Sequence, residues 1–120
     1  MIGHLFVWLF YVSISSSEPS GGAQNVTEHN TSSTSILVTW NEVPVEQRNG
    51  IITDYTIVYK SQTENHNGNV VVSANERQKN ITGLKEYVFY NITVFASTVK
   101  GDGPESSPVL VVRTDRKSVV

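Results

Sequence analysis

The sequence predicts an all-β domain, a sandwich of about seven strands. Short runs alternate β-branched or aromatic residues with polar ones, as the run from Ile36 to Trp40 does. Turn dipeptides such as Asn49-Gly50 and Gly103-Pro104 separate these runs. Beyond the first 17 residues, no stretch of ten or more residues shows the 3.6-residue period of an amphipathic helix. We therefore expect strands and turns throughout the folded part of the chain.

Composition limits both the size and the chemistry of this domain. The chain has 120 residues, 38% of them hydrophobic and 17% charged, with a formal net charge of −2 and no cysteine. This length fits one domain at most, and the missing cysteines exclude disulfides, thiolate zinc sites and cysteine nucleophiles. The slight acidic excess gives no basic surface for a phosphate backbone. We expect no nucleic-acid partner and a core held by packing alone.

The N-terminal segment has the pattern of a secretory signal peptide. Residues Leu5 to Val12 are all apolar, and small residues at Ser15 and Ser17 precede Glu18, the first formal charge. The stretch is too short for a transmembrane helix, which needs about 20 apolar residues. The segment before Leu5 carries no Lys or Arg, and a buried N-terminal strand or a mis-assigned first exon are the alternatives. The expected domain limits are 1–17 for the signal peptide, 18–22 for a linker, 23–115 for the folded domain and 116–120 for a C-terminal tail.

Five strands follow from the alternation of apolar and polar residues. They cover Ile36 to Trp40, Tyr55 to Lys60, Val70 to Val72, Val88 to Thr98, and Val109 to Val112. Asn49-Gly50 and Asn67-Gly68 are the expected turns, because both residue types tolerate positive φ. The remaining strands of the sandwich are not resolved by the pattern.

The chain resembles the fibronectin type III module over Ala23 to Asp115. The motifs that carry the resemblance are Trp40, then Asn49-Gly50 before Asp54-Tyr55-x-Ile57-x-Tyr59, Leu84 six residues before Tyr90, Tyr90-x-Ile92-x-Val94-x-Ala96, and Gly101-x-Gly103-Pro104-x-Ser106. The resemblance implies a seven-stranded, immunoglobulin-like sandwich without disulfides, of the kind found in extracellular parts of receptors and adhesion proteins. Glu86 departs from the pattern, because family members often have Pro two residues after the Leu.

Two aromatic residues are the expected centres of the core. Trp40 is expected between the two sheets, and Tyr90 is expected to form a tyrosine corner, with its ring buried and its hydroxyl bonded to a backbone group near Leu84. The other expected core residues are Val26, Ile36, Val38, Tyr55, Ile57, Tyr59, Ile81, Leu84, Ile92, Val94, Leu110 and Val112.

Four Asn-x-Ser/Thr sequons make the chain a candidate glycoprotein. Their acceptors are Asn25, Asn30, Asn80 and Asn91. Three of them have the opposite strand parity to core residues, and Asn30 is expected in a turn, so all four should face outward. We expect glycans at more than one of them if the chain is secreted.

Two short features are candidate interaction sites. Lys100-Gly101-Asp102 falls where some members of this family display an integrin-binding Arg-Gly-Asp, although a Gly-x-Gly-Pro turn is common there without that function. Phe95 and Val58 have outward parity on strands expected to be adjacent, so they are expected to form a small apolar patch for a partner or a neighbouring module. Scattered surface apolar residues are the ordinary alternative.

Motifs for catalysis, metal binding and cofactor binding are missing from the sequence. The histidines are His4, His29 and His66, with no His-Glu-x-x-His pair, no Walker loop, no Gly-x-Ser-x-Gly and no dinucleotide fingerprint. We therefore expect neither an enzyme nor a cofactor or metal.

The predicted function is a non-catalytic extracellular interaction or adhesion module. The partner is expected to be a protein ligand or a neighbouring extracellular domain, and a membrane only if the chain is part of a larger anchored protein. Localisation is then secreted, or the extracellular side of the plasma membrane. The alternatives are an accessory module of a receptor-type tyrosine phosphatase or another enzyme whose catalytic part is absent, and a purely structural spacer.

Overall fold

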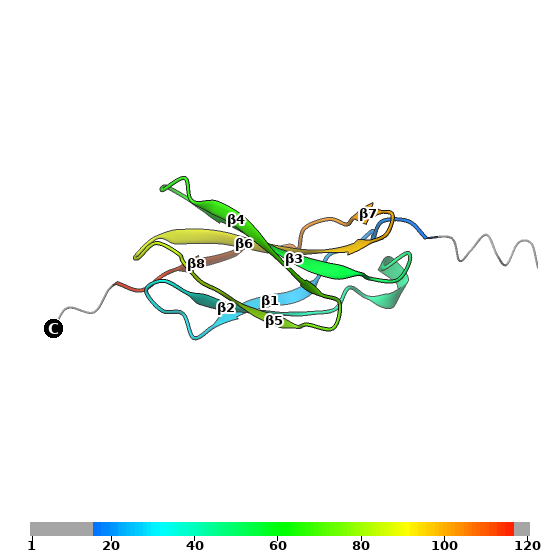
Figure 1. Ribbon diagram of the computed structural model, residues 1–120, viewed down its shortest axis with the longest axis horizontal. Coiled ribbons are helices and arrows are strands. Elements are labelled where there is room, and N and C mark those ends of the chain that lie inside the picture. The colour runs from blue at the N-terminus through cyan, green and yellow to red at the C-terminus, as the bar shows by residue number, and fades with distance from the viewer. Residues whose placement is uncertain (1–15, 117–120) are drawn as a thin grey trace, which may run out of the picture.

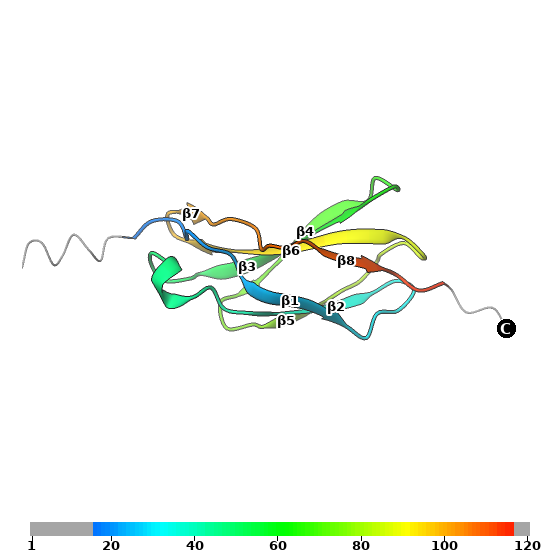
Figure 2. The same cartoon turned by 180° about the vertical axis from the view of Figure 1, so that it is seen from behind.

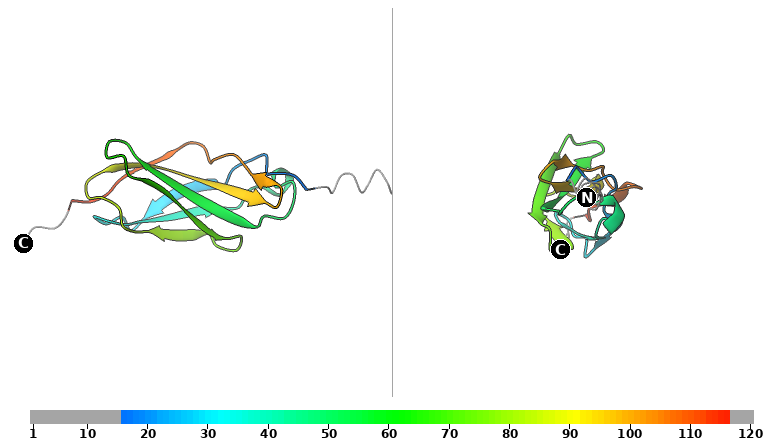
Figure 3. Two further views of the ribbon diagram at one scale, coloured as in Figure 1. Left: turned by 45° about the horizontal axis from the view of Figure 1, so that its top comes forward. Right: turned by 90° about the vertical axis from the view of Figure 1, so that its right-hand side faces the viewer.

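The computed structural model describes residues 16–116 and shows two facing antiparallel sheets (Figure 1). Most of the expected signal peptide, residues 1–15, and most of the expected tail, residues 117–120, lie outside the described residues. The chain end at residue 16 and the chain end at residue 116 lie at opposite ends of the sandwich (Figures 2 and 3).

One sheet has three strands and the other has five. The three-stranded sheet has the order β1-β2-β5, and the five-stranded sheet has the order β4-β3-β6-β7, with β8 also paired to β6. The strands are β1 (Gln24–His29), β2 (Ile36–Asn41), β3 (Asp54–Ser61), β4 (Asn67–Ser73), β5 (Gln78–Ile81), β6 (Phe89–Thr98), β7 (Gly101–Asp102) and β8 (Leu110–Arg113). The predicted all-β sandwich is confirmed.

The structure has eight strands because the last strand position is interrupted. Both β7 and β8 pair with β6, and the segment between them contains Pro104 and Pro108, which lack the backbone N–H that a ladder requires. A three-residue 3-10 turn, Val45–Gln47, is the helical element of the described chain. Within residues 16–116, no helix has the length and apolarity needed to cross a bilayer.

Aromatic and branched aliphatic side chains fill the space between the sheets. Trp40 is 2% exposed and its ring centroid lies 5.9 Å from that of Tyr55, which is 1% exposed. Tyr90 is fully buried. The other buried apolar residues are Ala23, Ile36, Val38, Val43, Ile57, Ile81, Leu84, Val88, Ile92, Val94, Ala96 and Val112.

Three residues expected in the core are only partly buried. Tyr59, Val26 and Leu110 pack against the buried cluster from its edge. Tyr59 lies on the β3–β4 hairpin, which projects beyond the rest of the sandwich (Figure 1). Its ring packs at the margin against His66 and Tyr90, with centroids 5.9 and 6.0 Å away.

The turn expected at Asn67-Gly68 is wrong, because both residues lie in β4. The chain reverses earlier, before His66, with Asn65 at a φ of 51°. Gly68 leaves room for a ring: a Cβ there would collide with the hydroxyl and ring of Tyr59 and displace that side chain. The glycine therefore allows the Tyr59 ring to lie close to the strand. The sequence Asn-Gly is the same in this role as in a turn, so the pattern alone does not separate the two.

The segment expected to link the signal peptide to the domain lies against the sandwich. Pro19 is buried, and the Ser20 amide donates to the Gln47 carbonyl at 2.9 Å. The Asn49 side-chain amide donates to the Glu18 carbonyl at 3.1 Å. These contacts fasten residues 18–20 to the loop between β2 and β3.

Candidate interaction surface

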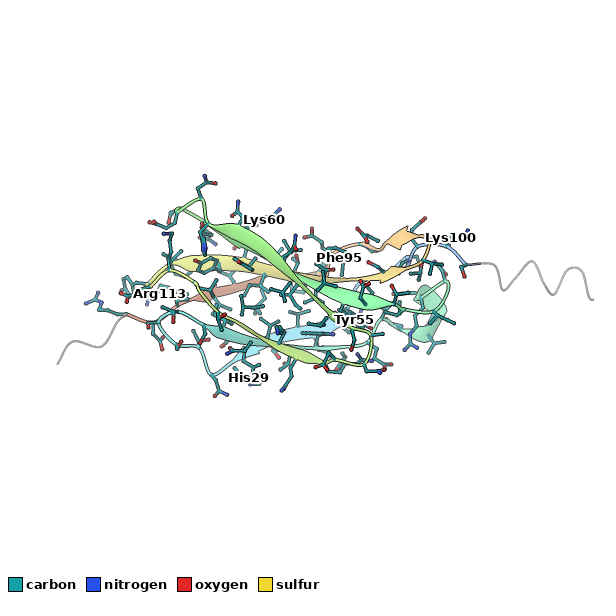
Figure 4. The ribbon with its side chains drawn as sticks, viewed as in Figure 1. His29, Tyr55, Lys60, Phe95, Lys100 and Arg113 are labelled. Atoms are coloured by element: carbon teal, nitrogen blue, oxygen red, sulfur yellow. The ribbon has the colours of Figure 1, made fainter. Side chains whose placement is uncertain are left out.

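The outer face of the five-stranded sheet places three side chains in one row. Val71 of β4 and Phe95 of β6 both pair with Thr56 of β3. In the next row, Asn69 and Thr93 flank Val58. We call the set Asp54, Thr56, Val58, Asn69, Val71 and Phe95 the Phe95 face. Figure 4 shows Phe95 on the outer side of the sheet and His29 on the opposite side of the molecule.

The Phe95 face combines apolar side chains with buried polar ones. Val71 is 61% exposed, whereas Phe95 and Val58 are half-buried and Thr56 is 6% exposed. Val58 pairs with Thr93 rather than with Phe95, so these two apolar residues are diagonal neighbours. The pattern of β3 and β6 places Phe95 and Val58 together, but it misses Val71, because the register of β4 is set by a turn at another position.

A shallow groove crosses this face toward the turn between β6 and β7. Polar groups form its rim, and the Ser97 hydroxyl donates to the Asp102 carboxylate at 2.7 Å. The lining residues are Thr53, Asp54, Thr56, Asn69, Val71, Phe95, Ser97, Thr98 and Asp102. An apolar centre with a polar rim is the usual composition of a protein-binding patch.

Lys100-Gly101-Asp102 is not displayed at the tip of a flexible loop. Val99 and Lys100 form a tight turn, and Gly101 and Asp102 return as β7, paired with Thr98 and Ser97. The Asp102 carboxylate is engaged by Ser97, as described above. Asp102 therefore belongs to the rim of the Phe95 face, and Lys100 stands exposed at the turn (Figure 4).

Three of the four sequon asparagines lie on the three-stranded sheet or its margin. Asn25 sits at an irregularity of β1, Asn30 follows β1, and Asn80 lies in β5; all three are exposed. Asn91 lies in β6 on the five-stranded sheet, is half-buried, and accepts a hydrogen bond from the Gln62 side chain at 2.8 Å. Glycans at the first three positions would cover the opposite side of the molecule from the Phe95 face.

A charged cluster closes the loop after β2. Glu42 contacts the guanidinium of Arg48 at 2.6 Å and that of Arg77 on its other oxygen. The hydrogen bond and charge of Arg77, joined by the charge of Arg48, lower the pKa of Glu42 from its usual 4.5. Arg77 also lies over the Tyr55 ring, 5.3 Å from its centroid. Because both guanidinium groups are already engaged by the one carboxylate of Glu42, we assign the cluster a structural role.

The described part of the chain offers no metal centre. Within residues 16–116, no three or more His, Asp or Glu side chains are grouped to hold an ion. His66 is instead bonded to the Tyr90 hydroxyl, with 2.8 Å between Nδ1 and the oxygen.

Comparison with known proteins agrees with the fold. The family model described as "Fibronectin type III domain" matches residues 17–112. Over 100 residues the chain is 43% identical to protein sidekick-1 of Gallus gallus, and over 102 residues it is 42% identical to receptor-type tyrosine-protein phosphatase F of Mus musculus. Each match covers 82% of this chain but only 5% of the relative, so the chain spans a small part of their length.

Solved structures show the same architecture. The chicken CNTN1 FN1-FN3 domains align with a TM-score of 0.73 at 26% identity, covering 82% of this chain and 32% of that one. The FN5 domain of Drosophila Lar aligns with a TM-score of 0.65 at 31% identity, covering 82% of this chain and 99% of that one.

Proposed function

The chain belongs to the fibronectin type III family, and from that premise we propose that it is a non-catalytic extracellular recognition module whose protein partner binds the Phe95 face. The observation that carries the proposal is the row Val71–Thr56–Phe95. It places an exposed valine and a half-buried aromatic ring on either side of Thr56 on the outer face of the sheet, with Val58 in the next row.

The distribution of glycosylation acceptors supports this face over the opposite one. Three sequons lie on the three-stranded side, where glycans would keep a protein partner away. On the five-stranded side, Asn91 is four residues from Phe95 along β6, about 13 Å at the rise of an extended strand. A glycan at Asn91 would limit the approach from one end and leave the Phe95 end open.

The chemistry of the face suits a partner with a complementary apolar group. Aromatic anchors near the centre of a patch carry most of the binding energy, while surrounding polar groups exclude water and set orientation. Phe95 has this central place, between Thr56 and the Ser97–Asp102 pair. We expect the partner to place one apolar side chain in the groove and hydrogen-bond to its rim.

Secretion follows from the expected signal peptide. We propose cleavage after Ser17, so that the mature chain begins at Glu18 and keeps the Asn49 and Gln47 contacts of residues 18–20. The product is then secreted, or lies on the extracellular side of the membrane as part of a larger anchored chain.

A binding screen tests the recognition function. The chain, multimerised on beads, is presented to a panel of cell-surface ectodomains, and binders are re-measured with Phe95→Ser. Loss of a central aromatic anchor should weaken binding by about 30-fold or more. The matched control is Ile51→Ser, which removes an apolar side chain that is 84% exposed and outside the Phe95 face. Equal binding by both variants would contradict the placement of the site.

A spacer or accessory module is the second candidate. This function is favoured because the chain matches only 5% of the length of relatives such as a receptor-type phosphatase, in which one such domain is a small part of the whole protein. In that role no surface substitution would alter any interaction. If the screen finds no binder for the wild-type chain, the spacer function replaces recognition.

A further inference from the structure

The outer edge of β4 pairs with no other strand of the described chain and is seven residues long. Its sequence, Asn67–Ser73, contains no charge, no proline and no sequon, and includes three consecutive valines. Such an edge presents free backbone donors and acceptors that can pair with another strand. The β3–β4 hairpin also projects from the body of the sandwich, so the edge is accessible (Figures 1 and 2).

The register shows which backbone groups are free. The Ser61 amide donates to the His66 carbonyl at 3.1 Å, and the Gln62 amide donates to the Phe89 carbonyl at 2.9 Å. In an antiparallel ladder hydrogen-bonded pairs alternate with non-bonded ones, so odd-numbered residues of β3 bond to β4 and even-numbered ones bond to β6. The β4 residues paired with even-numbered β3 residues therefore point their N–H and C=O groups away from the sheet; they are Asn67, Asn69, Val71 and Ser73.

The neighbouring edges are protected against strand addition. β1 has an irregular register, contains the acceptor Asn25 and is followed by the acceptor Asn30. β5 has four residues and carries Lys79 and the acceptor Asn80. β8 also has four residues and ends in Arg113. Charges, short length and bulges are the usual means of blunting an edge, and β4 has none of them.

We propose that β4 pairs antiparallel with β4 of a second copy of this chain, joining the two five-stranded sheets into one. A two-fold axis at Val70 sets Asn67 opposite Ser73 of the second copy and Asn69 opposite Val71 of the second copy. Every free amide and carbonyl of the edge is then used, in about eight backbone hydrogen bonds. Pairing of β4 with β4 of a second copy is compatible with this sequence, because the strand has no charged residues and so no like charges lie opposite each other.

This pairing also extends the apolar row across the interface. The row Phe95–Thr56–Val71 continues into Asn69 and Val58 of the second copy, by the same register on both sides. The dimer needs only the free edge, so it does not depend on the partner proposed for the Phe95 face.

Sedimentation of the mature chain at concentrations up to about 1 mM, a range that includes weak self-association, tests the proposal. Wild type and Asn69→Ala should dimerise, and Asn69→Pro should remain monomeric, with a Tm equal to that of the wild type in dilute solution, where the wild type is also monomeric. Proline at position 69 removes an N–H that points away from β3, so the fold keeps its ladder while the free edge loses a donor. A wild-type chain that stays monomeric, or an Asn69→Pro variant that dimerises, overturns the proposal.

Hydrogen exchange provides a readout that does not depend on the proline variant. The Asn69 and Val71 amides of the wild type should exchange at least tenfold more slowly in the concentrated sample than in the dilute one, whereas the Val70 amide, bonded to β3, should be protected in both. Concentration-independent exchange at Asn69 and Val71 would contradict the pairing. Phe95→Ser should dimerise like the wild type, which separates this proposal from the recognition function.

Discussion

The Tyr90 hydroxyl accepts a hydrogen bond from the Lys85 backbone amide at 2.9 Å, and this bond fixes the loop before β6 to the strand itself. The same hydroxyl lies 2.8 Å from His66 Nδ1. The one hydroxyl thus has two partners, the Lys85 amide and the His66 ring, and the histidine tautomer sets which atom donates in the second bond. This is the tyrosine corner expected from the spacing of Leu84 and Tyr90.

Tyr90→Phe should destabilise the fold while leaving the ring in place. The Lys85 amide and His66 would lose their partner, and because Lys85 is exposed and His66 half-buried, the cost should be that of an ordinary hydrogen bond, about 0.5–1.5 kcal/mol. Urea unfolding measures the loss, with Tyr59→Phe as the control on a neighbouring, half-buried phenol. A loss no greater than that of Tyr59→Phe would show that the corner contributes little.

The stabilisation from Tyr90 should disappear at high pH. Burial raises the pKa of Tyr90 above its usual 10.0, against the opposing effect of the Lys85 hydrogen bond. The folded state thus favours the neutral phenol; this contribution is complete below pH 10 and is lost as the pH rises through the folded-state pKa. The difference in urea midpoint between wild type and Tyr90→Phe should shrink at alkaline pH, and a constant difference would exclude this origin.

Trp40→Ala should be the most damaging single core substitution tested. Trp40 is 2% exposed and lies between the sheets against Tyr55, so its loss leaves a cavity that costs about 3–5 kcal/mol. Val45→Ala, a truncation at a residue that is 73% exposed, provides the control and should change stability little. Comparable unfolding free energies for the two variants would be inconsistent with this core.

Glu42→Gln should lower stability at neutral pH and have no effect in acid. Because Arg77 and Arg48 lower the pKa of Glu42, the ionised carboxylate is favoured in the folded state. That contribution is present above pH 4.5 and is lost as the pH falls through the folded-state pKa. The Tm difference between the two proteins should close as the pH falls below 4.5. It should also shrink in high salt, since the cluster is partly exposed. A difference that persists in acid would point to packing instead.

Secretion from animal cells should yield a chain that begins at Glu18 and carries more than one N-glycan. Asn25, Asn30 and Asn80 are exposed, so each can meet the glycosylation machinery more readily than half-buried Asn91. Intact mass before and after glycosidase treatment reports the cleavage point and the glycan number together. A secreted product whose mass is unchanged by the glycosidase would refute this expectation.

The sequence pattern predicts the three central strands β2, β3 and β6, together with parts of the edge strands β4 and β8. β2, β3 and β6 alternate strongly because one face of each fills the core around Trp40 and Tyr90. β1 and β5 are polar edge strands with a single inward apolar residue each, Val26 and Ile81, so periodicity does not reveal them.

The candidate surface was only half predictable. The parity of β3 and β6 places Phe95 and Val58 on one face, since each strand alternates independently of its neighbours. Placing Val71 beside them requires the β3–β4 register, which depends on the turn before His66. The Asn67-Gly68 dipeptide predicts a turn at a later position, so it gives the wrong register. The local alternation of residues thus predicts which face of a strand a residue lies on, but not which residue of the next strand it pairs with.

A glycan installed on the Phe95 face tests the central claim most directly. Val71→Thr turns Asn69 into the acceptor of a new sequon, with little change in side-chain size. Val71→Thr made without glycosylation should bind the partner found by the screen more weakly than the wild type, because it loses an apolar contact, but still measurably, and the glycosylated form should fail to bind. Undiminished binding by the glycosylated form, with occupancy at Asn69 verified by mass, would contradict recognition through this face.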